Sequence, residues 1–154
     1  MKYNSTLQNW KKKELIASDL VNISNKILID KGVELVFLRK HLIDKNSSEI
    51  LNFHDYGNKI HKSKLNIKNS LKIAKHIYEQ DLNPAKIDIG KLQLEYLNKR
   101  NNKSIESYTN EKIKDFLKSK YKFSMKPKDV ILFGFGRIGR LAARELIKQA
   151  GKGQ

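Results

Sequence analysis

The sequence predicts two unequal parts, a mostly α-helical region over residues 1–126 and the start of an incomplete α/β domain over residues 127–154. Three observations lead to this fold class. Apolar residues recur at helical spacing through the first part. Near the end, a short apolar run precedes a glycine-rich turn and an amphipathic stretch. The composition also changes at Pro127, because five of the eight glycines and none of the fourteen asparagines lie from there onward.

The first helix is expected over about residues 5–31, and Gly32 provides a suitable end for it. Its apolar residues at helical spacing are Ile16, Leu20, Ile23 and Ile27. Residues 33–38 form an apolar run rich in strand formers, so we expect a strand there, although a buried connection also fits. Asn46 and Glu49 have the spacing of a capping box and predict the start of the next helix. That helix carries Ile50, Leu51 and His54.

Three more helices are expected before the boundary. The first of them passes through Ile67, Leu71, Ala74 and Ile77. Asn83 and Pro84 then predict a turn, after which Asp88 can cap a helix. The apolar side chains of that helix are Leu92, Tyr96 and Leu97. The last helix is expected over about residues 104–120, with inward-facing Ile113, Phe116 and Leu117.

The glycine-rich turn, Gly-Phe-Gly-Arg-Ile-Gly-Arg, lies between the apolar residues 130–133 and the amphipathic stretch 141–147. A Gly-x-Gly-x-x-Gly turn binds a dinucleotide only when a strand precedes it and a helix follows it, and both flanks fit. Gly134 permits the sharp turn, Gly136 leaves room for a pyrophosphate, and Gly139 lets the helix pack on the sheet.

The pattern therefore predicts the first strand and helix of a Rossmann-type domain, in preference to an ordinary glycine-rich turn. The unpaired backbone amides at the start of the helix would donate to the phosphates. The predicted cofactor-binding residues are Gly134, Phe135, Gly136, Arg137, Ile138 and Gly139. We predict a strand at residues 130–133 whose apolar side chains stay poorly protected here, because a parallel strand is normally covered on both faces.

This turn, with an aliphatic run ahead and Leu-Ala-Ala-Arg-Glu-Leu behind, resembles the opening of the cofactor domain of glyceraldehyde-3-phosphate dehydrogenases. The resemblance covers about residues 129–147. In that family, backbone amides at the positions of Arg137 and Ile138 hold the NAD pyrophosphate. The family has an asparagine before the first glycine, where this chain has Phe133. Related sugar-phosphate dehydrogenases share the turn, and 2-hydroxy-acid dehydrogenases carry looser versions of it.

The resemblance implies a phosphorylating oxidoreductase of glycolysis or gluconeogenesis. Such an enzyme would be cytoplasmic and homo-oligomeric, and the family resemblance implies a tetramer. Its cofactor would be NAD or NADP and its small-molecule substrate glyceraldehyde 3-phosphate. In the family a thiolate attacks the aldehyde, hydride passes to the cofactor, and phosphate releases the acyl group. This chain has no cysteine, and no acidic residue follows Glu145 to bind the adenosine ribose. We therefore expect the N-terminal part of a longer dehydrogenase, without catalytic residues and inactive alone.

The net charge of +16 raises a competing hypothesis, a basic helical module that binds nucleic acid or protein and has a chance glycine turn. The 32 basic residues comprise 27 lysines and only 5 arginines, and the aromatic residues are scattered. Sequence-specific readers of nucleic acid use arginine together with grouped aromatics. We therefore favour a lysine-rich solvated surface and expect no specific nucleic-acid partner. The sequence contains no long apolar run, so we expect no membrane partner.

Few other residues of the first part suggest chemistry. His54 and His61 can share a helix face near Asp55, but a metal site needs a third converging ligand, so we expect surface or half-buried histidines and no metal. The other two histidines, His41 and His76, match no motif.

Two acidic pairs, Glu14 with Asp19 and Asp81 with Asp88, could act as acid and base. Helix capping and solvation explain them better, because they lie at helix ends among lysines and asparagines. Trp10 is expected to anchor the first helix by packing.

Overall fold

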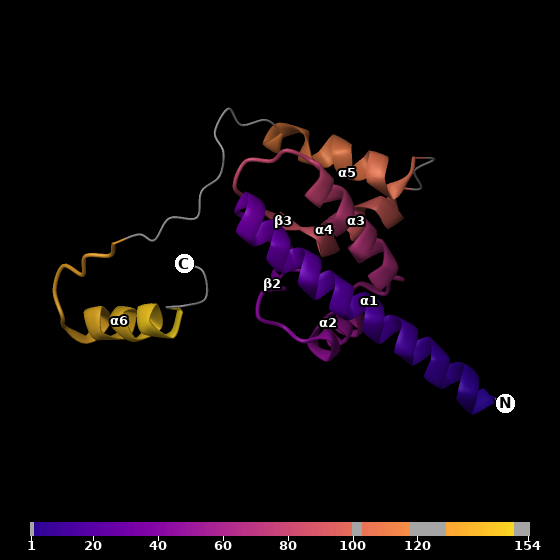
Figure 1. Cartoon of the computed structure of the whole chain (residues 1–154), viewed down its shortest axis with the longest axis horizontal. Helices are drawn as coiled ribbons and strands as arrows, with labels where there is room; N and C mark the ends of the chain where they lie inside the picture. The colour runs from indigo at the N-terminus through magenta and orange to yellow at the C-terminus, as the bar shows by residue number, and fades with distance from the viewer. Residues whose placement is uncertain (1, 100–102, 118–128, 150–154) are drawn as a thin grey trace. The chain divides into compact units, whose positions relative to one another are not determined.

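The computed structural model describes residues 2–99, 103–117 and 129–149 (Figure 1). Contacts divide the chain into two units, Met1–Phe123 and Ser124–Gln154. The elements of the first unit are α1 (Lys2–Lys31), β1 (Val33–Phe37), β2 (Lys40–His41), α2 (Ser47–His61), α3 (Ile67–Glu79), β3 (Ala85–Asp88), α4 (Ile89–Asn98), α5 (Ile105–Ile113) and the short 3₁₀ helix η1 (Lys114–Phe116). The chain is therefore mostly helical, with a small sheet of mixed direction.

Helix α1 forms the spine of the first unit and packs on α2, α3 and β1. The residues that it buries completely are Ala17, Leu20, Ser24 and Ile27. The turns before Glu14 are exposed, and Figure 1 shows this end of α1 extending past the helices that it packs against. Trp10 lies on these turns and is 53% exposed, so the expectation that it packs as an anchor is wrong.

Helix α2 begins where the capping box predicted it. The Asn46 side chain accepts a hydrogen bond from the Glu49 amide at 2.9 Å, and the Glu49 carboxylate accepts one from the Asn46 amide at 3.0 Å. These bonds satisfy backbone donors that the helix leaves unpaired. The bond from the Asn46 amide also lowers the pKa of Glu49, and the hydrogen bond from Lys45 lowers it further. Helix α3 likewise begins after Asn66, which accepts from the Lys68 amide at 2.9 Å.

The sheet has the strand order β2-β1-β3, with β2 antiparallel and β3 parallel to β1. Strand β1 confirms the strand expected at residues 33–38. Strand β3 lies where only a turn was expected, because its short sequence, Ala-Lys-Ile-Asp, carries no run of strand formers. Pairing with β1 in the register Val33↔Ala85 to Val36↔Asp88 supplies the hydrogen bonds that make it a strand.

The turn between β1 and β2 is held from a distance by Asp88. Leu38 and Arg39 both have left-handed backbone angles, with φ of 48° and 67°, which is unfavourable for residues other than glycine. The Asp88 carboxylate accepts hydrogen bonds from the amides of Leu38 (2.8 Å) and Arg39 (2.9 Å), and also from the Lys91 amide (2.9 Å) as the cap of α4. One side chain thus joins a strained hairpin, the end of β3 and the start of α4.

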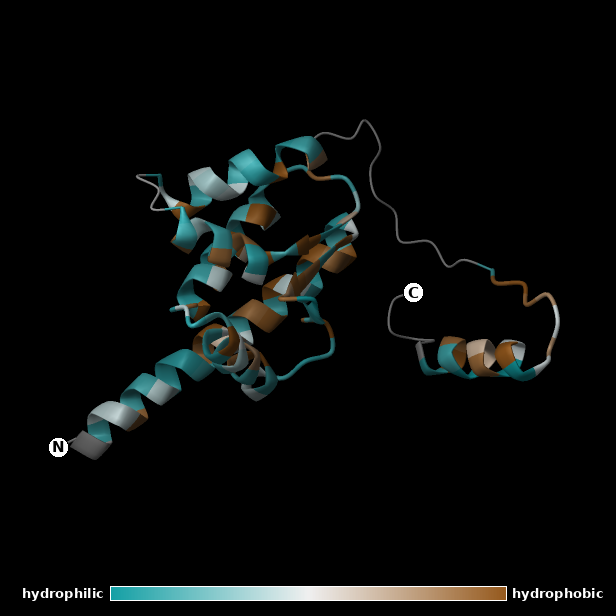
Figure 2. Ribbon diagram, turned by 180° about the vertical axis from the view of Figure 1, so that it is seen from behind, coloured by the Kyte–Doolittle hydropathy of each residue, from teal (hydrophilic) through white to brown (hydrophobic). Residues whose placement is uncertain are grey.

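Two glycines allow Leu38 to sit between α2 and α4. A Cβ atom at Gly90 would lie 2.8 Å from the Leu38 amide nitrogen, and one at Gly57 would lie 2.8 Å from Leu38 Cδ1. Both contacts are closer than packed atoms approach. Figure 2 shows that the hydrophobic residues of this unit gather on the strands and on the inner sides of the helices. The core includes the fully buried Phe37, Ile50 and Ile77.

Helix α5 is shorter than expected, because η1 replaces its last part. Ile113 is buried, but Phe116 is 41% exposed and does not face the core as expected. Leu117 forms an isolated antiparallel bridge with Leu82. The rest of the expected helix, residues 118–120, and the boundary at Pro127 lie outside the described residues.

Candidate nucleotide-binding turn

The second unit contains the glycine turn and helix α6 (Arg137–Gln149), which begins where the sequence predicts. The Arg140 amide donates to the Gly136 carbonyl at 3.0 Å, and this bond opens the helix. The preceding helical amides, those of Arg137, Ile138 and Gly139, have no acceptor within an α-helix. They stand at the positive end of the helix dipole, which favours an anion. All six predicted cofactor-binding residues thus lie in one short turn.

Two of the three glycines are needed for the shape of this turn. Gly134 has a φ of 93°, a conformation that other residues rarely adopt. A Cβ atom at Gly139 would lie only 2.3 Å from the Gly134 carbonyl oxygen. Gly136 differs, because a Cβ atom there would meet nothing within 4 Å. The space beside Gly136 is therefore open, as a group approaching the backbone would require.

The strand predicted at residues 130–133 is not formed, and this prediction is wrong for the chain as it stands. No segment of the described chain pairs with these residues, and a strand depends on hydrogen bonds to a neighbour. Ile131 is 91% exposed and Phe133 fully exposed. Large apolar side chains of α6 are exposed as well, among them Ile138, Leu141 and Ile147. The poor protection of this unit agrees with the expectation.

The histidines do not form a metal site, and the described residues contain no cluster of three potential metal ligands. His54 is buried, with only 4% of its surface exposed, which corrects the expectation of a surface or half-buried position. Its Nδ1 donates to the Ile50 carbonyl (2.8 Å), and its Nε2 accepts from the Ser70 hydroxyl (2.8 Å). The centroids of the His54 and Phe37 rings are 4.0 Å apart. Burial lowers the pKa of His54. Both ring nitrogens are engaged, which leaves neither free for a metal.

A buried amide completes this polar network. Gln93 is fully buried and donates to the Ser70 oxygen at 3.0 Å and to the Asn66 carbonyl at 3.1 Å. The Asn66 amide in turn donates to the Gln93 side-chain oxygen. The network links α2, α3 and α4 and satisfies polar groups that would otherwise be costly to bury. It therefore explains His54 and Ser70 as structural residues.

One member of each acidic pair has a structural partner. Asp88 accepts the three backbone hydrogen bonds described above, and one oxygen of Glu14 accepts from the Ser47 hydroxyl. These bonds agree with capping and packing roles. Within the described ranges, no helix is both long and apolar enough to cross a membrane.

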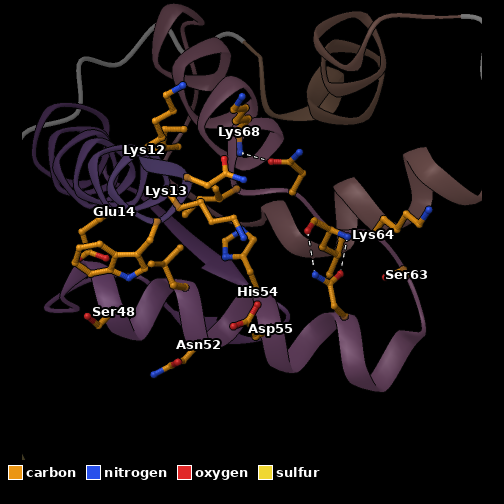
Figure 3. Close-up of a pocket in the computed structure, with 18 residues that line it drawn as sticks. Lys12, Lys13, Glu14, Ser48, Asn52, His54, Asp55, Ser63, Lys64 and Lys68 are labelled. Carbon is orange, nitrogen blue, oxygen red and sulfur yellow. Dashed lines mark hydrogen bonds between the residues drawn. The ribbon is translucent and has the colours of Figure 1, made fainter. Parts of the chain in front are cut away.

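Sequence reasoning missed a cavity of about 680 Å³ in the first unit (Figure 3). It lies between α1, α2 and the segment that leads into α3. Its wall includes Trp10, His54 and the basic residues Lys12, Lys13, Lys64 and Lys68. The signal in the sequence was an aromatic residue, Trp10, followed directly by three lysines, but it was interpreted as a packing anchor.

Comparison with known proteins relates part of this chain to one dehydrogenase-like protein, whereas no protein-family model matches it. A glyceraldehyde-3-phosphate dehydrogenase-like protein of Pseudomonas aeruginosa (strain UCBPP-PA14) is 33% identical over 91 residues. These residues are 59% of this chain, and the chain covers 20% of the relative. The second unit has only 31 residues, so at least 60 of the matched residues lie in the first unit. The similarity therefore extends into the helical region.

Proposed function

We propose that this chain is the N-terminal part of an NAD(P)-dependent oxidoreductase of the glyceraldehyde-3-phosphate dehydrogenase type. Its helical region, residues 1–126, precedes a cofactor domain that begins at residue 127. The glycine turn binds the cofactor pyrophosphate, and the thiolate, the base and the ribose-binding acid belong to a part of the protein beyond residue 154. The substrate is glyceraldehyde 3-phosphate, and the assembly is homo-oligomeric.

One observation carries this proposal, the turn that opens α6. Gly139 closes against the Gly134 carbonyl, the space beside Gly136 is open, and three helical amides have no partner within the helix. These groups suit a pyrophosphate, which binds helix N-termini through backbone donors and the helix dipole. The similarity to the dehydrogenase-like protein supports the same conclusion. When bound, the cofactor accepts or donates hydride, while the residues of this chain hold and orient it.

The apolar side chains of the second unit also support an incomplete domain. Ile138, Leu141 and Ile147 of α6 are exposed, and so are Val130 and Ile131. So many exposed apolar side chains in a short segment are typical of a surface that lies against further structure. In the proposed enzyme, the neighbouring strands and helices of the cofactor domain would cover it.

The basic-module hypothesis has weaker support. In the first unit, lysines lie over aromatic rings of the same chain, for example Lys40 over Tyr56 at 4.1 Å and Lys31 over Tyr78 at 5.3 Å. These rings are engaged by neighbouring cations, whereas a nucleic-acid surface would present them for base stacking. We therefore retain the oxidoreductase proposal.

Two substitutions in the full-length protein test the turn. Gly136→Val places its side chain in open space, so we expect a folded protein whose NAD affinity falls at least tenfold through obstruction of the pyrophosphate. Gly139→Val pushes against the Gly134 carbonyl, so we expect the turn itself to be disrupted and binding to be lost. Calorimetry with NAD and NADP measures both effects, and Lys148→Gln, at an exposed polar position near the end of α6, is the control.

Unchanged NAD affinity in Gly136→Val would contradict the assigned turn. The full-length protein should also oxidise glyceraldehyde 3-phosphate in the presence of phosphate. The 154-residue chain alone should be inactive and should bind NAD very weakly, because only the first part of the site is present. Micromolar NAD affinity of the 154-residue chain would refute the expectation that it binds NAD very weakly.

A further inference from the structure

The turn between β1 and β2 carries an exposed arginine in a backbone conformation that arginine does not favour. Leu38 and Arg39 lie between the paired residues Phe37 and Lys40, and their φ angles are 48° and 67°. Positive φ at both central residues is the pattern of a type I′ turn, in which asparagine and glycine are the usual residues. Arginine is less stable there, because its Cβ atom approaches the following carbonyl oxygen. An explanation for Arg39 must therefore come from its side chain.

The Leu38 side chain explains its own backbone strain, but the Arg39 side chain does not. Leu38 packs between Gly57 and Gly90 against the core, so apolar burial offsets its conformation. Arg39 is exposed, and its guanidinium forms no hydrogen bond or ion pair with any residue that the structure describes. Asp88 binds the backbone amide of Arg39, at 2.9 Å, and not its side chain. Strained residues of this kind gather at binding sites and ligand clamps, where the strain serves a contact made on binding.

Aromatic and basic side chains lie beside this turn. Lys40 Nζ is 4.1 Å from the centroid of the Tyr56 ring and 4.9 Å from that of the Phe53 ring. These contacts place one face of α2 next to the turn. Tyr56 is 51% exposed, and Ile60, one helical turn further along α2, is 55% exposed. We call Arg39, Lys40, Tyr56 and Ile60 the hairpin patch. Arginine and tyrosine are enriched at the centres of protein interfaces, so this composition is that of a protein-binding surface.

Charge decides which kind of partner fits the hairpin patch. The patch has two cations and no carboxylate of its own, and the nearby Asp88 carboxylate is engaged by three backbone amides. A second copy of this chain would be repelled, because the net charge is +16. Nucleic acid also fits poorly, because base stacking needs an available aromatic ring and Lys40 already engages that of Tyr56. A guanidinium, by contrast, presents a fixed fork of donors that matches a carboxylate.

We propose that the hairpin patch binds an acidic segment of a partner protein. A carboxylate of the partner pairs with the Arg39 guanidinium, and apolar side chains next to that carboxylate pack on Tyr56 and Ile60. Asp88 fixes the turn and thereby holds Arg39 in place before the partner arrives. This interaction surface belongs to the first unit, so it does not depend on cofactor binding at the glycine turn.

The side-chain Nε–H signals of isotope-labelled arginine test the proposal by nuclear magnetic resonance in the 154-residue chain. The chain has only five arginines, and Arg39→Lys identifies the signal of Arg39 by removing it. The probe is a synthetic peptide of repeated Glu-Glu-Leu-Phe units, added at about pH 6, where its carboxylates are ionised. We expect the Arg39 signal to shift and the other four to stay in place.

Two control peptides separate charge from apolar contact. Repeats of Gln-Gln-Leu-Phe lack the carboxylates, and repeats of Glu-Glu-Gly-Ser lack the apolar side chains. Each should bind about tenfold more weakly than the Glu-Glu-Leu-Phe peptide, because one loses a charge-assisted hydrogen bond and the other loses apolar burial. Fluorescence anisotropy of labelled peptides measures these affinities.

Matched variants of the chain test the geometry of Arg39. Arg39→Lys keeps the charge but loses the fork of donors, so it should weaken the Glu-Glu-Leu-Phe peptide about tenfold. Tyr56→Ala should weaken it by a similar factor through lost packing. Lys75→Gln removes a charge at an exposed position on α3 and should leave the affinity unchanged. Far-ultraviolet circular dichroism checks that each variant is folded.

Arg39→Gly tests whether the arginine is kept for binding at the expense of stability. Glycine adopts positive φ readily, so the Tm should rise by about 2–4 °C while affinity for the Glu-Glu-Leu-Phe peptide falls at least tenfold. A lower Tm in Arg39→Gly would show that the arginine stabilises the fold, and the argument from strain would fail.

Three other results would overturn the proposal. No binding of the Glu-Glu-Leu-Phe peptide at millimolar concentration would mean that the hairpin patch is an ordinary solvated surface. Equal shifts of all five arginine signals, or equal affinity for the two acidic peptides, would show nonspecific charge attraction. Polyuridylate that shifts the Arg39 signal and displaces the peptide would identify a nucleic-acid surface instead.

Discussion

Replacing Asp88 by alanine should destabilise the first unit more than any ordinary surface substitution. Its carboxylate accepts hydrogen bonds from the amides of Leu38 (2.8 Å), Arg39 (2.9 Å) and Lys91 (2.9 Å). Loss of a helix cap costs about 1 kcal/mol. Loss of a partly buried, charge-assisted bond costs about 1.5 kcal/mol or more, and the exposed bond to Arg39 contributes less. Asp88→Ala should therefore lower the free energy of unfolding by about 2–4 kcal/mol.

Asp88→Asn gives a graded comparison. The Leu38 and Lys91 amides bind Oδ1, and the Arg39 amide binds Oδ2. Asparagine keeps one oxygen for the first two amides and loses the third bond, so a cost of about 1 kcal/mol is expected. The control is Asp81→Ala at an exposed position, which should change stability by about 0.5 kcal/mol or less.

Urea unfolding followed by far-ultraviolet circular dichroism measures these differences by linear extrapolation. The expected order of destabilisation is Asp88→Ala, then Asp88→Asn, then Asp81→Ala. The reasoning would be refuted if Asp88→Ala and Asp81→Ala were equally stable. That result would show that the left-handed turn at Leu38 and Arg39 holds without its distant acceptor.

Two other substitutions probe the interior of the first unit. Burial lowers the pKa of His54, so at mildly acidic pH the unfolded chain binds a proton that the folded chain does not. The free energy of unfolding should therefore fall as the pH drops below about 6.5. His54→Gln should remove this part of the pH dependence, as measured by urea unfolding at several pH values. An unchanged pH profile in His54→Gln would contradict this cause. Gly90→Ala should destabilise by about 1–3 kcal/mol, because its Cβ meets the Leu38 amide at 2.8 Å, although alanine favours helices. A more stable Gly90→Ala variant in thermal unfolding would show that Leu38 can move aside.

Local patterns in the sequence predicted much of the fold. Asn46 with Glu49 and Asp88 mark helix starts because capping depends on a few neighbouring residues. Periodic apolar residues likewise predicted α1 and α3, since one helix face must be buried. The glycine turn was also readable, because the positive φ of Gly134 and the start of α6 are local properties.

Tertiary structure decided the features that depend on residues far apart. Strand β3 exists because it pairs with β1, about fifty positions earlier, and residues 130–133 form no strand because nothing in the described chain pairs with them. Similarly, His54 is buried because Ser70 and Phe37 close around it, whereas Trp10 is exposed because α1 extends past its neighbours.

The sequence by itself therefore determined several helix starts, the glycine turn and the resemblance to a dehydrogenase opening. Only the tertiary structure brought Trp10, Glu14 and Ser63 around one cavity. The physical reason is that caps and turns arise from contacts within a few residues, whereas strand pairing, burial and cavities arise from contacts between segments that the chain order does not specify.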